Sequence, residues 1–452
     1  MLRSLNSSSS HDHEDDDDLD HHHQIHQELP IALHFLPKIV RFPPPPPPQG
    51  VPCSAASGAP SSSMPLPSSV HLKQLLIRCA EFIALSDYAT AHQILSILSS
   101  NSSPRGDATE RLAYYFTRAL SFHIDLRPRY YPVNDDLEDE TARQACYLSL
   151  NQVTPFIRFS HLTANQAILE AIERARNQPS LVHIVDFNIM HGVQWPPFMQ
   201  ALADRYNSSS PSLRITATGK ELTSLHRTGE RLAKFAQSLG LKFQFEPMVL
   251  PNDDPNSLTL FIPSSVRTSP DEVLAVNCVL HLHKLVKEEG EDGADLKSFL
   301  SAVKSLGPKI VTIAEREANH NHPVFMPRFM EALDHFSALF ESLEATLPSN
   351  SGERLEVERV LLGKEIVDIL GTNDGFMRRK KRTERHQRFG HWEGLMRSAG
   401  FINVPLSPFA LSQAKLLLRL HYPTDGYYLE VLNDSFFLGW HSRALFSVSS
   451  WQ

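Results

Sequence analysis

The sequence predicts an α/β protein with a doubly wound core and an α-helical cap, preceded by a disordered N-terminal tail. Short apolar runs alternate with amphipathic stretches beyond residue 180, which is the pattern of a sheet with crossover helices. A block of helical periodicity precedes the first of these runs. A low-complexity segment precedes that block in turn. The 41% of hydrophobic residues suffices for a sizeable core.

Residues 1–69 form the predicted tail. They hold the segment HDHEDDDDLDHHHQIH, six consecutive prolines at 43–48 and a serine-rich stretch. Low hydrophobicity and dense charge cannot offset the entropy of ordering, so we expect disorder, with polyproline II at the prolines. The histidines beside the acids offer metal ligands, and the prolines offer an SH3- or WW-type ligand. Nothing fixes a ligand geometry there, so a solvated tail is favoured.

Helices are predicted from Val70 onward. Apolar residues recur at three- and four-residue spacing, Ser86 and Asp87 interrupt them, and Asp107 with Glu110 resembles a capping box for a third helix. We expect Thr163 with Gln166 to begin another helix. The first helix also contains an LxxLL string of the type that docks in coregulator grooves, although leucines at this spacing more often form core. Its leucines are Leu72, Leu75 and Leu76.

The central strand is predicted at 181–186, LVHIVD, buried on both faces of a parallel sheet. Pro196 and Pro197 then open a helix. An acid such as Asp186 at the carboxyl end of this strand suggests a nucleotide or S-adenosylmethionine site. The turn at 187–192 has one glycine where a cofactor loop needs two or three, and no second acid closes the next strand. We therefore predict no cofactor.

Asp186 is instead expected to be structural. We predict that it accepts hydrogen bonds from backbone amides at the start of the Pro196 helix, where negative charge is also favoured. The apolar turn after it, with Ile189, Met190 and His191, should pack against the leading helices.

Further strands are predicted at 213–219, 241–245, 273–279, 310–314 and 401–404, with a helix at 222–239 and a polar loop at 251–256. Three short aromatic-rich runs then close the chain, at 426–431, 435–440 and 445–451. Alternating units that end in antiparallel strands indicate the methyltransferase-like variant of this Rossmann-type sheet.

Several long motifs resemble the GRAS family of plant transcriptional regulators. VHIVDF followed by HGVQWP is similar to its VHIID signature, and the resemblance covers about residues 70–452. FIRFSHLTANQAILEA and SPFALSQAKLLLRLHYP look most like the lateral suppressor branch, which is associated with axillary meristem formation and hence branching. The motif residues that the resemblance implies to be structural are Val182, His183, Ile184, Val185, Asp186, Gly192, Gln194, Trp195, Pro196, Trp392, Trp440 and Trp451.

The resemblance also divides the GRAS-type domain into regions. A mainly helical cap with the first leucine-rich region covers about 70–160, and the VHIID region with the second leucine-rich region about 161–247. The PFYRE region covers about 248–390 and the SAW region about 391–452. In the PFYRE region, Glu315, Glu317, His320 and His322 lie close together. The helical HExxH order is missing and Pro323 favours a loop, so we predict no metal site.

A basic run precedes the helix that carries Trp392. Its residues Arg378, Arg379, Lys380, Lys381 and Arg382 suit an import receptor or phosphate contact, against the alternative of a solvated linker. The net charge of −8 argues against broad DNA binding. Four cysteines without CxxC spacing indicate a reducing compartment, and no apolar run suits a membrane span or a signal peptide.

These observations predict a nuclear, non-enzymatic regulator that binds DNA-binding transcription factors and possible GRAS-type partners, with indirect or weak DNA contact. Two alternatives remain open. One is a regulator that contacts DNA directly through its basic surface. The other is an S-adenosylmethionine-dependent methyltransferase-like enzyme, which the glycine-poor turn and the absence of a GxSxG elbow or other catalytic motif disfavour.

Overall fold

The structure, a computed structural model, describes residues 69–124, 136–175, 179–206, 210–249, 266, 271–287, 294–348, 350–371, 382–423 and 425–452. All of them belong to one compact unit, Ile39–Gln452. The predictions for the tail at 1–68, for the loop at 251–256 and for the basic residues 378–381 lie outside the described residues.

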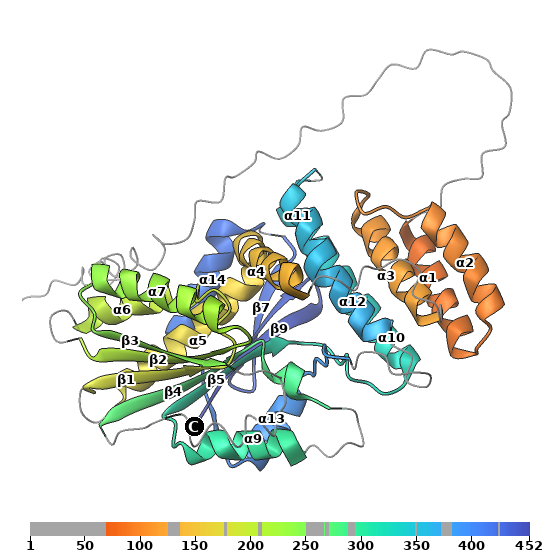
Figure 1. The fold of residues 1–452 in the computed structure, drawn as a ribbon. Helices are drawn as coiled ribbons and strands as arrows, with labels where there is room; N and C mark the ends of the chain where they lie inside the picture. Colours follow the sequence, from red (N-terminus) through yellow and green to blue (C-terminus); the bar gives the residue numbers. More distant parts are fainter. Residues whose placement is uncertain are drawn as a thin grey trace, which may run out of the picture. The chain divides into compact units, whose positions relative to one another are not determined.

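A single nine-stranded sheet forms the core, in the order β3-β2-β1-β4-β5-β9-β8-β7, with β6 paired to β9 (Figure 1). Its strands are β1 (Leu181–Asp186), β2 (Ser212–Gly219), β3 (Phe243–Val249), β4 (Glu272–Val279), β5 (Ile310–Arg316), β6 (Asn403–Val404), β7 (Tyr427–Leu432), β8 (Ser435–Trp440) and β9 (Arg443–Trp451). β1 to β5 are parallel, and β9, β8 and β7 continue the sheet antiparallel. This topology confirms the predicted methyltransferase-like fold class.

β1 lies in the middle of the parallel half because its apolar run can be buried on both sides. It pairs with β2 on one side and β4 on the other. The register places Asp186 opposite Ala217 and Asn277, so polar residues of β1 and β4 meet at the carboxyl edge of the sheet. Open α/β sheets bind ligands at this edge.

Helices cover both faces of the sheet (Figure 1). On one face lie α5 (Pro155–Glu173), α6 (Trp195–Tyr206), α7 (Leu222–Ser238) and α14 (Pro408–His421), and on the other lie α9 (Ala294–Ser305) and α13 (Phe389–Ser398). The core between α9, α13 and the sheet includes Phe299, Trp392, Val276 and Trp451. A short 3-10 helix, η3 (Leu282–Leu285), follows β4.

The helix before β1 starts earlier than predicted. α5 is one continuous helix from Pro155, and Thr163 and Gln166 are buried within it rather than capping its start. Pro155 begins the helix because its fixed φ suits the first turn, where its missing amide is not needed. The strand expected at 241–245 likewise begins later, at Phe243, and runs to Val249.

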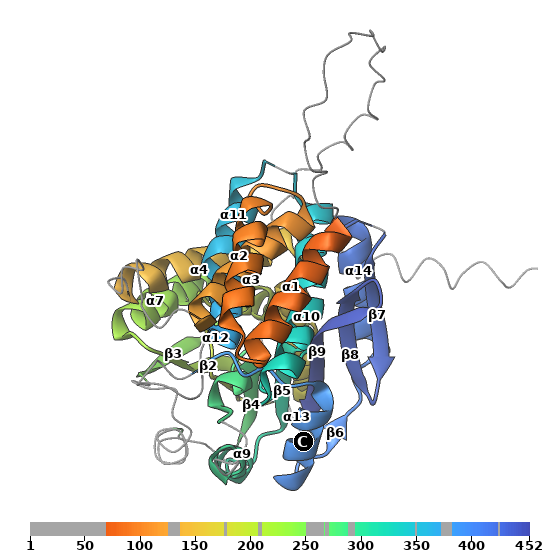
Figure 2. The ribbon, with the colours of Figure 1, turned by 90° about the vertical axis from the view of Figure 1, so that its right-hand side faces the viewer.

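The helical cap is built from α1 (Ser69–Ala84), α2 (Tyr88–Ser100) and α3 (Ala108–Ile124). These helices pack against one another and against α10 (Phe325–Thr346) and α12 (Gly363–Leu370), as Figures 1 and 2 show. Asp87 caps α2 by accepting from the Thr90 amide. Asp107 accepts from the Glu110 amide at the start of α3, where the sequence predicted a cap. The remaining helical elements are α4 (Asp136–Val153), α11 (Gly352–Val357) and the π-helical turn η4 (Glu358–Leu362).

A buried ion pair links the cap to the rest of this unit. Arg111 of α3 donates through Nε to the carboxylate of Glu358 in η4 at 3.0 Å, and both side chains are fully buried. Burying two charges removes their hydration, and the ion pair offsets this cost only if its hydrogen bonds replace the lost contacts with water. Among the described residues, Cys79, Cys146 and Cys278 are buried free thiols, and no helix is long and apolar enough to cross a membrane.

Candidate functional site

Asp186 lies at the end of β1 with only 1% of its surface exposed. Its Oδ2 accepts a hydrogen bond from Trp195 Nε1 at 2.9 Å. Its Oδ1 accepts from the backbone amide of Asn188 at 3.0 Å and from Asn277 Nδ2 at 3.3 Å. Both carboxylate oxygens are therefore engaged by donors of the chain itself.

A ring of amide side chains extends this arrangement. Gln194 donates through Nε2 to Asn277 Oδ1 and to Asn165 Oδ1, each at 3.1 Å, and accepts from Asn277 Nδ2 at 3.1 Å. Thr312 of β5 donates to Asn277 Oδ1 at 2.9 Å. We call Asp186, Asn188, Asn277, Gln194, Asn165, Trp195 and Thr312 the β1 cluster. These residues come from several elements and from the turn after β1, and they are hydrogen-bonded to one another.

Burial raises the pKa of Asp186 to about 6, while the hydrogen bonds from Asn188, Trp195 and Asn277 act to lower it. Desolvation therefore outweighs the three donors. A raised pKa at a strand end is also what a catalytic carboxyl shows. Here three donors of the chain itself already bind the carboxylate oxygens.

The turn after β1 packs against helices that cover the sheet. Phe187 stacks on His281 at 5.6 Å between ring centroids and meets Phe299 of α9 edge-on at 5.2 Å. Gly192 has φ +68°, and a Cβ there would lie 2.9 Å from Thr228 Cγ2 on α7. Of the leading helices, α5 reaches this region through Asn165, which donates to the Gln194 carbonyl at 2.9 Å.

Two details therefore differ from the sequence-based prediction. The donors to Asp186 are one amide of the turn and two side chains, and not amides of the Pro196 helix. The turn packs on α7 and α9 as well as on α5. The reason is that α6 begins at Trp195, which points its indole back to the carboxylate.

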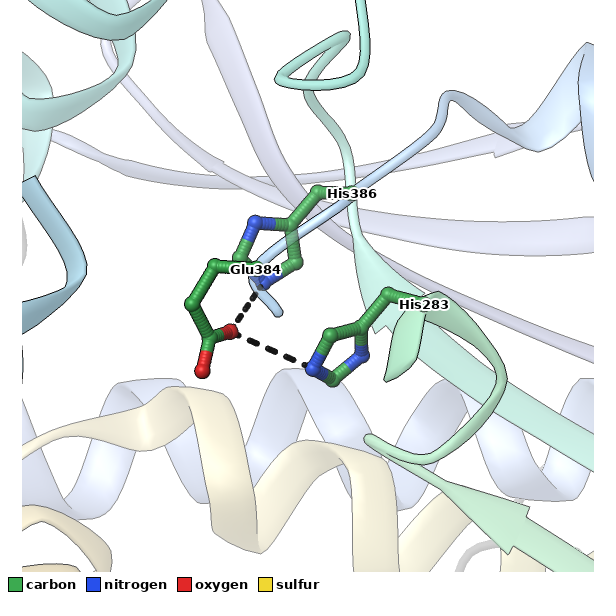
Figure 3. Close-up of side chains that lie close together, drawn as sticks. All are labelled: His283, Glu384 and His386. Carbon is green, nitrogen blue, oxygen red and sulfur yellow. Dashed lines mark ion pairs between the residues drawn. The ribbon is translucent and has the colours of Figure 1, made fainter. Parts of the chain in front are cut away.

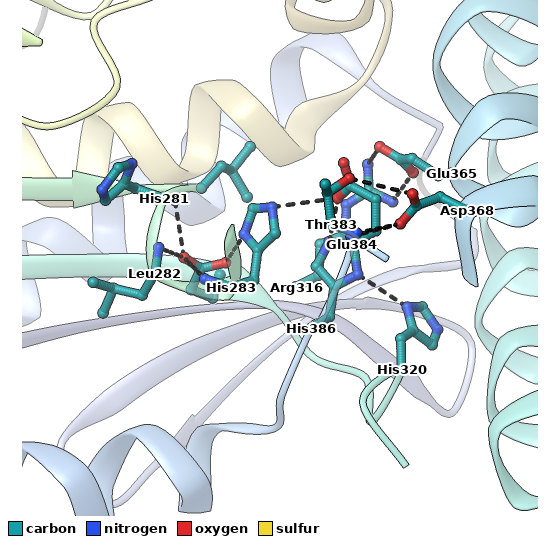
Figure 4. A network of polar contacts seen from close by, with 12 residues as sticks. His281, Leu282, His283, Arg316, His320, Glu365, Asp368, Thr383, Glu384 and His386 are labelled. Atoms are coloured by element: carbon teal, nitrogen blue, oxygen red, sulfur yellow. Dashed lines mark hydrogen bonds and ion pairs between the residues drawn. The ribbon is translucent and has the colours of Figure 1, made fainter. Parts of the chain in front are cut away.

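A second buried polar group lies where β4 and β5 end. Glu315 of β5 accepts through Oε1 from the backbone amides of His281 at 3.0 Å and Leu282 at 2.7 Å. Its Oε2 accepts from His283 Nδ1 at 2.7 Å. Figure 4 shows His281, Leu282 and His283 in the same network as Glu384 and His386. We call Glu315, His283, Glu384, His386 and His320 the histidine cluster.

The segment that follows residue 381 supplies the other half of the histidine cluster. Glu384 Oε2 lies 3.3 Å from His283 Nε2 and 3.4 Å from His386 Nε2 (Figure 3). Asp368 of α12 fixes this segment by accepting from the amides of Thr383 at 2.8 Å and Glu384 at 2.7 Å. His320 also binds it, because its amide donates to the His386 carbonyl at 3.0 Å.

Burial and the neighbouring charges together set the pKa values of the histidine cluster. Burial opposes a charge on His283, but Glu315 and Glu384 outweigh it and raise its pKa to about 9. Burial also opposes ionisation of Glu384, yet the hydrogen bond and charge of His283 hold its pKa at about 2. Burial holds the pKa of His386 well below its ordinary range, and that of His320 at about 3.

Sequence reasoning singled out Glu315 and His320 in this region but missed His283, Glu384 and His386. His283 lies far from the other two in sequence, and Glu384 lies two residues after Arg382, the last residue of a basic run that was interpreted as an import-receptor or phosphate contact. The one available signal was a pair of histidines just beyond a buried strand, since His281 and His283 follow the end of β4 at Val279 by two and four residues.

The structure places the other predicted residues as follows. Trp392, Trp440 and Trp451 are buried on α13, β8 and β9, and Val182, His183, Ile184 and Val185 are buried in β1. His183 Nε2 lies 2.8 Å from Thr216 Oγ1 across the sheet. In the LxxLL string, Leu72 and Leu76 are buried and Leu75 is half-buried, so docking through them would require α1 to detach. Arg382 is only 5% exposed.

Comparisons with known proteins identify relatives across nearly the whole described chain. The GRAS domain family matches residues 72–452. Scarecrow-like protein 18 of Arabidopsis thaliana is 47% identical over 84% of this chain and 91% of its own length. Protein MONOCULM 1 of Oryza sativa subsp. japonica is 43% identical over 84% of this chain and 88% of its length. The crystal structure of SCL7 in Oryza sativa aligns with a TM-score of 0.70 at 35% identity, covering 86% of this chain and all of that one.

Proposed function

Because this chain belongs to the GRAS domain family, we propose that it is a plant transcriptional regulator that acts in the nucleus through protein partners rather than by catalysis. The β1 cluster is the observation that supports action through partners rather than by catalysis. Asp186 occupies the position of a cofactor-binding acid, but Trp195, Asn188 and Asn277 already satisfy its oxygens. A methyltransferase would need that acid and the adjacent turn to be open to its cofactor.

The partners that we propose are DNA-binding transcription factors, with a second GRAS-type chain as a further candidate. Partner binding is favoured over direct DNA contact because several arginines of the described residues are already paired with acids: Arg316 pairs with Glu365, Arg388 and Arg443 pair with Glu331, and Arg397 pairs with Glu393. A role in shoot development, in axillary meristem initiation and branching, is supported by the lateral suppressor-type motifs of the sequence and by the 43% identity to Protein MONOCULM 1.

A gel-shift experiment separates partner binding from direct DNA contact. DNA-binding transcription factors that co-purify with the full-length chain from shoot tissue would first be produced as pure proteins. The chain alone should leave the target DNA of such a factor unshifted at physiological salt, and should supershift the complex of factor and DNA. A shift of DNA by the chain alone, weakening steeply with salt, would replace the proposal by the direct-contact alternative.

Nuclear entry is proposed to depend on the basic run. Replacing Arg378, Arg379, Lys380 and Lys381 with Gln should move a fluorescent fusion toward the cytoplasm, and an added import signal should restore both localisation and activity. Arg382 stays unchanged because its buried side chain belongs to the fold. The matched control replaces four exposed basic residues elsewhere, Arg227, Lys234, Lys415 and Arg419, and should remain nuclear. Unchanged localisation of the first variant would contradict the import role.

A further inference from the structure

Three side chains of the histidine cluster converge on one point. His283 comes from η3 after β4, while Glu384 and His386 come from the segment that leads to α13. One ligand atom of each lies within 4.8 Å of the other two. Figure 3 shows that the imidazole nitrogens of both histidines face the same carboxylate oxygen. Two imidazoles and a carboxylate are the ligand set of many three-residue zinc sites.

The separations match those between ligands of a small tetrahedral ion. Zinc binds nitrogen and carboxylate oxygen at about 2.0–2.1 Å, so two ligands of a tetrahedral site lie about 3.3 Å apart. Glu384 Oε2 lies 3.3 Å from His283 Nε2 and 3.4 Å from His386 Nε2. The two rings are 4.5 Å apart with their planes inclined by 29°. The third pair of ligand atoms, one from each imidazole, lies within 4.8 Å. A small shift of His386 would bring this pair to the tetrahedral separation and leave the contact between His283 and Glu315 in place.

The outer contacts of His283 are those of a metal ligand. Its Nδ1 donates to Glu315 at 2.7 Å, which leaves Nε2 to face Glu384. Glu315 is itself fixed by the amides of His281 and Leu282. A carboxylate behind the ring is the arrangement that orients metal-bound histidines and increases their basicity. His386 has an imidazole rather than a carboxylate behind it, because its Nδ1 lies 3.0 Å from His320 Nδ1.

His386 supplies an independent observation. Its side chain is 1% exposed, and its Nε2 lies 3.4 Å from Glu384 Oε2 without forming a hydrogen bond to any described residue. Buried polar atoms are rarely left without a partner, and a bound ion can supply the partner that such an atom lacks. Glu384 keeps 15% of its side chain exposed, which makes it the most solvent-exposed of the three side chains.

We propose that His283, Glu384 and His386 bind one divalent transition-metal ion, with zinc as the preferred ion and water as the fourth ligand. The two carboxylates of Glu315 and Glu384 together balance the charge of a divalent ion. The nearby Arg316 is already paired with Glu365. A site with two imidazoles favours zinc over calcium or magnesium, which prefer all-oxygen ligands. The ion links η3, at the end of β4, to the segment that enters α13, so it acts as a structural connection between distant parts of the chain.

Metal titration of the full-length protein tests this site. The seven histidines of the tail are replaced by Gln in an untagged chain, so that they do not contribute ligands; they are His11, His13, His21, His22, His23, His26 and His34. After dialysis against a chelator, this parent protein should take up one Co²⁺ per chain with the visible absorption of a tetrahedral ion, and Zn²⁺ should displace it. Zn²⁺ should also raise the melting temperature of the parent.

Three variants of this parent locate the site. Glu384→Gln and His386→Gln should lose the Co²⁺ absorption and the zinc-dependent rise in melting temperature, while circular dichroism confirms that they are folded. Glu315→Gln should weaken binding about 10–100-fold, because it removes the carboxylate behind His283. The control, His226→Gln, alters an exposed histidine of α7 and should bind like the parent.

The parent protein decides the proposal even if a variant fails to fold. A folded parent that takes up no Co²⁺ or Zn²⁺ would leave the cluster as an ion pair between His283 and Glu384 and would overturn the proposal. Stoichiometric uptake that persists in both Glu384→Gln and His386→Gln would also overturn it, because the ion would then be held elsewhere.

Discussion

The β1 cluster and the histidine cluster lie at the same edge of the sheet and differ in how their polar groups are satisfied. Around Asp186, neutral amides and one indole donate to the carboxylate, and the amide side chains hydrogen-bond to one another. Around Glu315, two carboxylates meet imidazoles, and His386 Nε2 lacks a hydrogen bond within the described chain. Burial and position therefore do not make a ligand site. The unmet hydrogen-bonding capacity distinguishes the second cluster from the first.

The largest expected effect is the loss of Glu315. Glu315→Ala leaves the amides of His281 and Leu282 and the His283 side chain without their buried acceptor. Breaking a buried charged pair from one side destabilises by about 3–5 kcal/mol. Urea unfolding at pH 7 in the presence of a chelator should show this loss. The exposed control Glu230→Ala should change stability by less than about 0.5 kcal/mol. An equal effect of the two substitutions would contradict the buried role of Glu315.

The pH dependence of stability should report the desolvation of Asp186. Its pKa rises from 3.8 to about 6 on burial, so the folded state holds the proton more tightly than the unfolded state. This contribution is present below about pH 3.8 and is lost as the pH rises through 6. A pKa difference of about two between the folded and unfolded states corresponds to about 3 kcal/mol of unfolding free energy.

The comparison with Asp186→Asn isolates this contribution. Urea unfolding between pH 3.5 and 7.5 (about the window of the shift) should show parent stability falling relative to the variant as the pH rises. Parallel curves for the two proteins would contradict a raised pKa at Asp186.

Asp186→Ala tests the hydrogen bonds rather than the charge. The substitution leaves Trp195 Nε1 and the Asn188 amide without an acceptor, and the expected loss is about 1–3 kcal/mol. Partner binding should be lost only in proportion to the unfolded fraction. A variant as stable as the parent but unable to bind partners would show that Asp186 has a direct functional role.

Gly192→Ala should have the smallest effect, of about 1–2 kcal/mol. Its φ of +68° is unfavourable for alanine, and the added Cβ would meet Thr228 Cγ2 at 2.9 Å. Gly192 closes the turn that brings Gln194 and Trp195 to Asp186, since its carbonyl accepts from the Trp195 amide. Gly240→Ala is the matched control: it has the same φ, but nothing lies within 4 Å of the added Cβ. Equal losses would show that backbone strain alone accounts for the effect.

Local patterns predicted the fold class and the position of Asp186 at the end of β1 for a physical reason. The apolar run of β1, the acid that ends it and the prolines after it are adjacent in sequence, so their roles follow from strand burial and helix initiation. The partners of Asp186 were harder to predict, because Asn277 reaches it through the register of β4.

The histidine cluster was beyond prediction from sequence patterns. His283 and Glu384 meet only because β4 lies beside β5 and because Asp368 holds the segment after residue 381 in place. No fixed spacing encodes that contact. The start of α5 was mistaken for a similar reason: Thr163 and Gln166 form a plausible cap locally, while tertiary packing buries both within a longer helix.

Whether the β1 end of the sheet is closed to a cofactor is tested most directly by isothermal titration calorimetry with S-adenosylmethionine. Because Trp195, Asn188 and Asn277 already satisfy Asp186, the full-length protein should give no heat beyond that of dilution. A micromolar dissociation constant that Asp186→Asn abolishes, with the melting temperature unchanged, would contradict this and would restore the methyltransferase-like enzyme as the better interpretation.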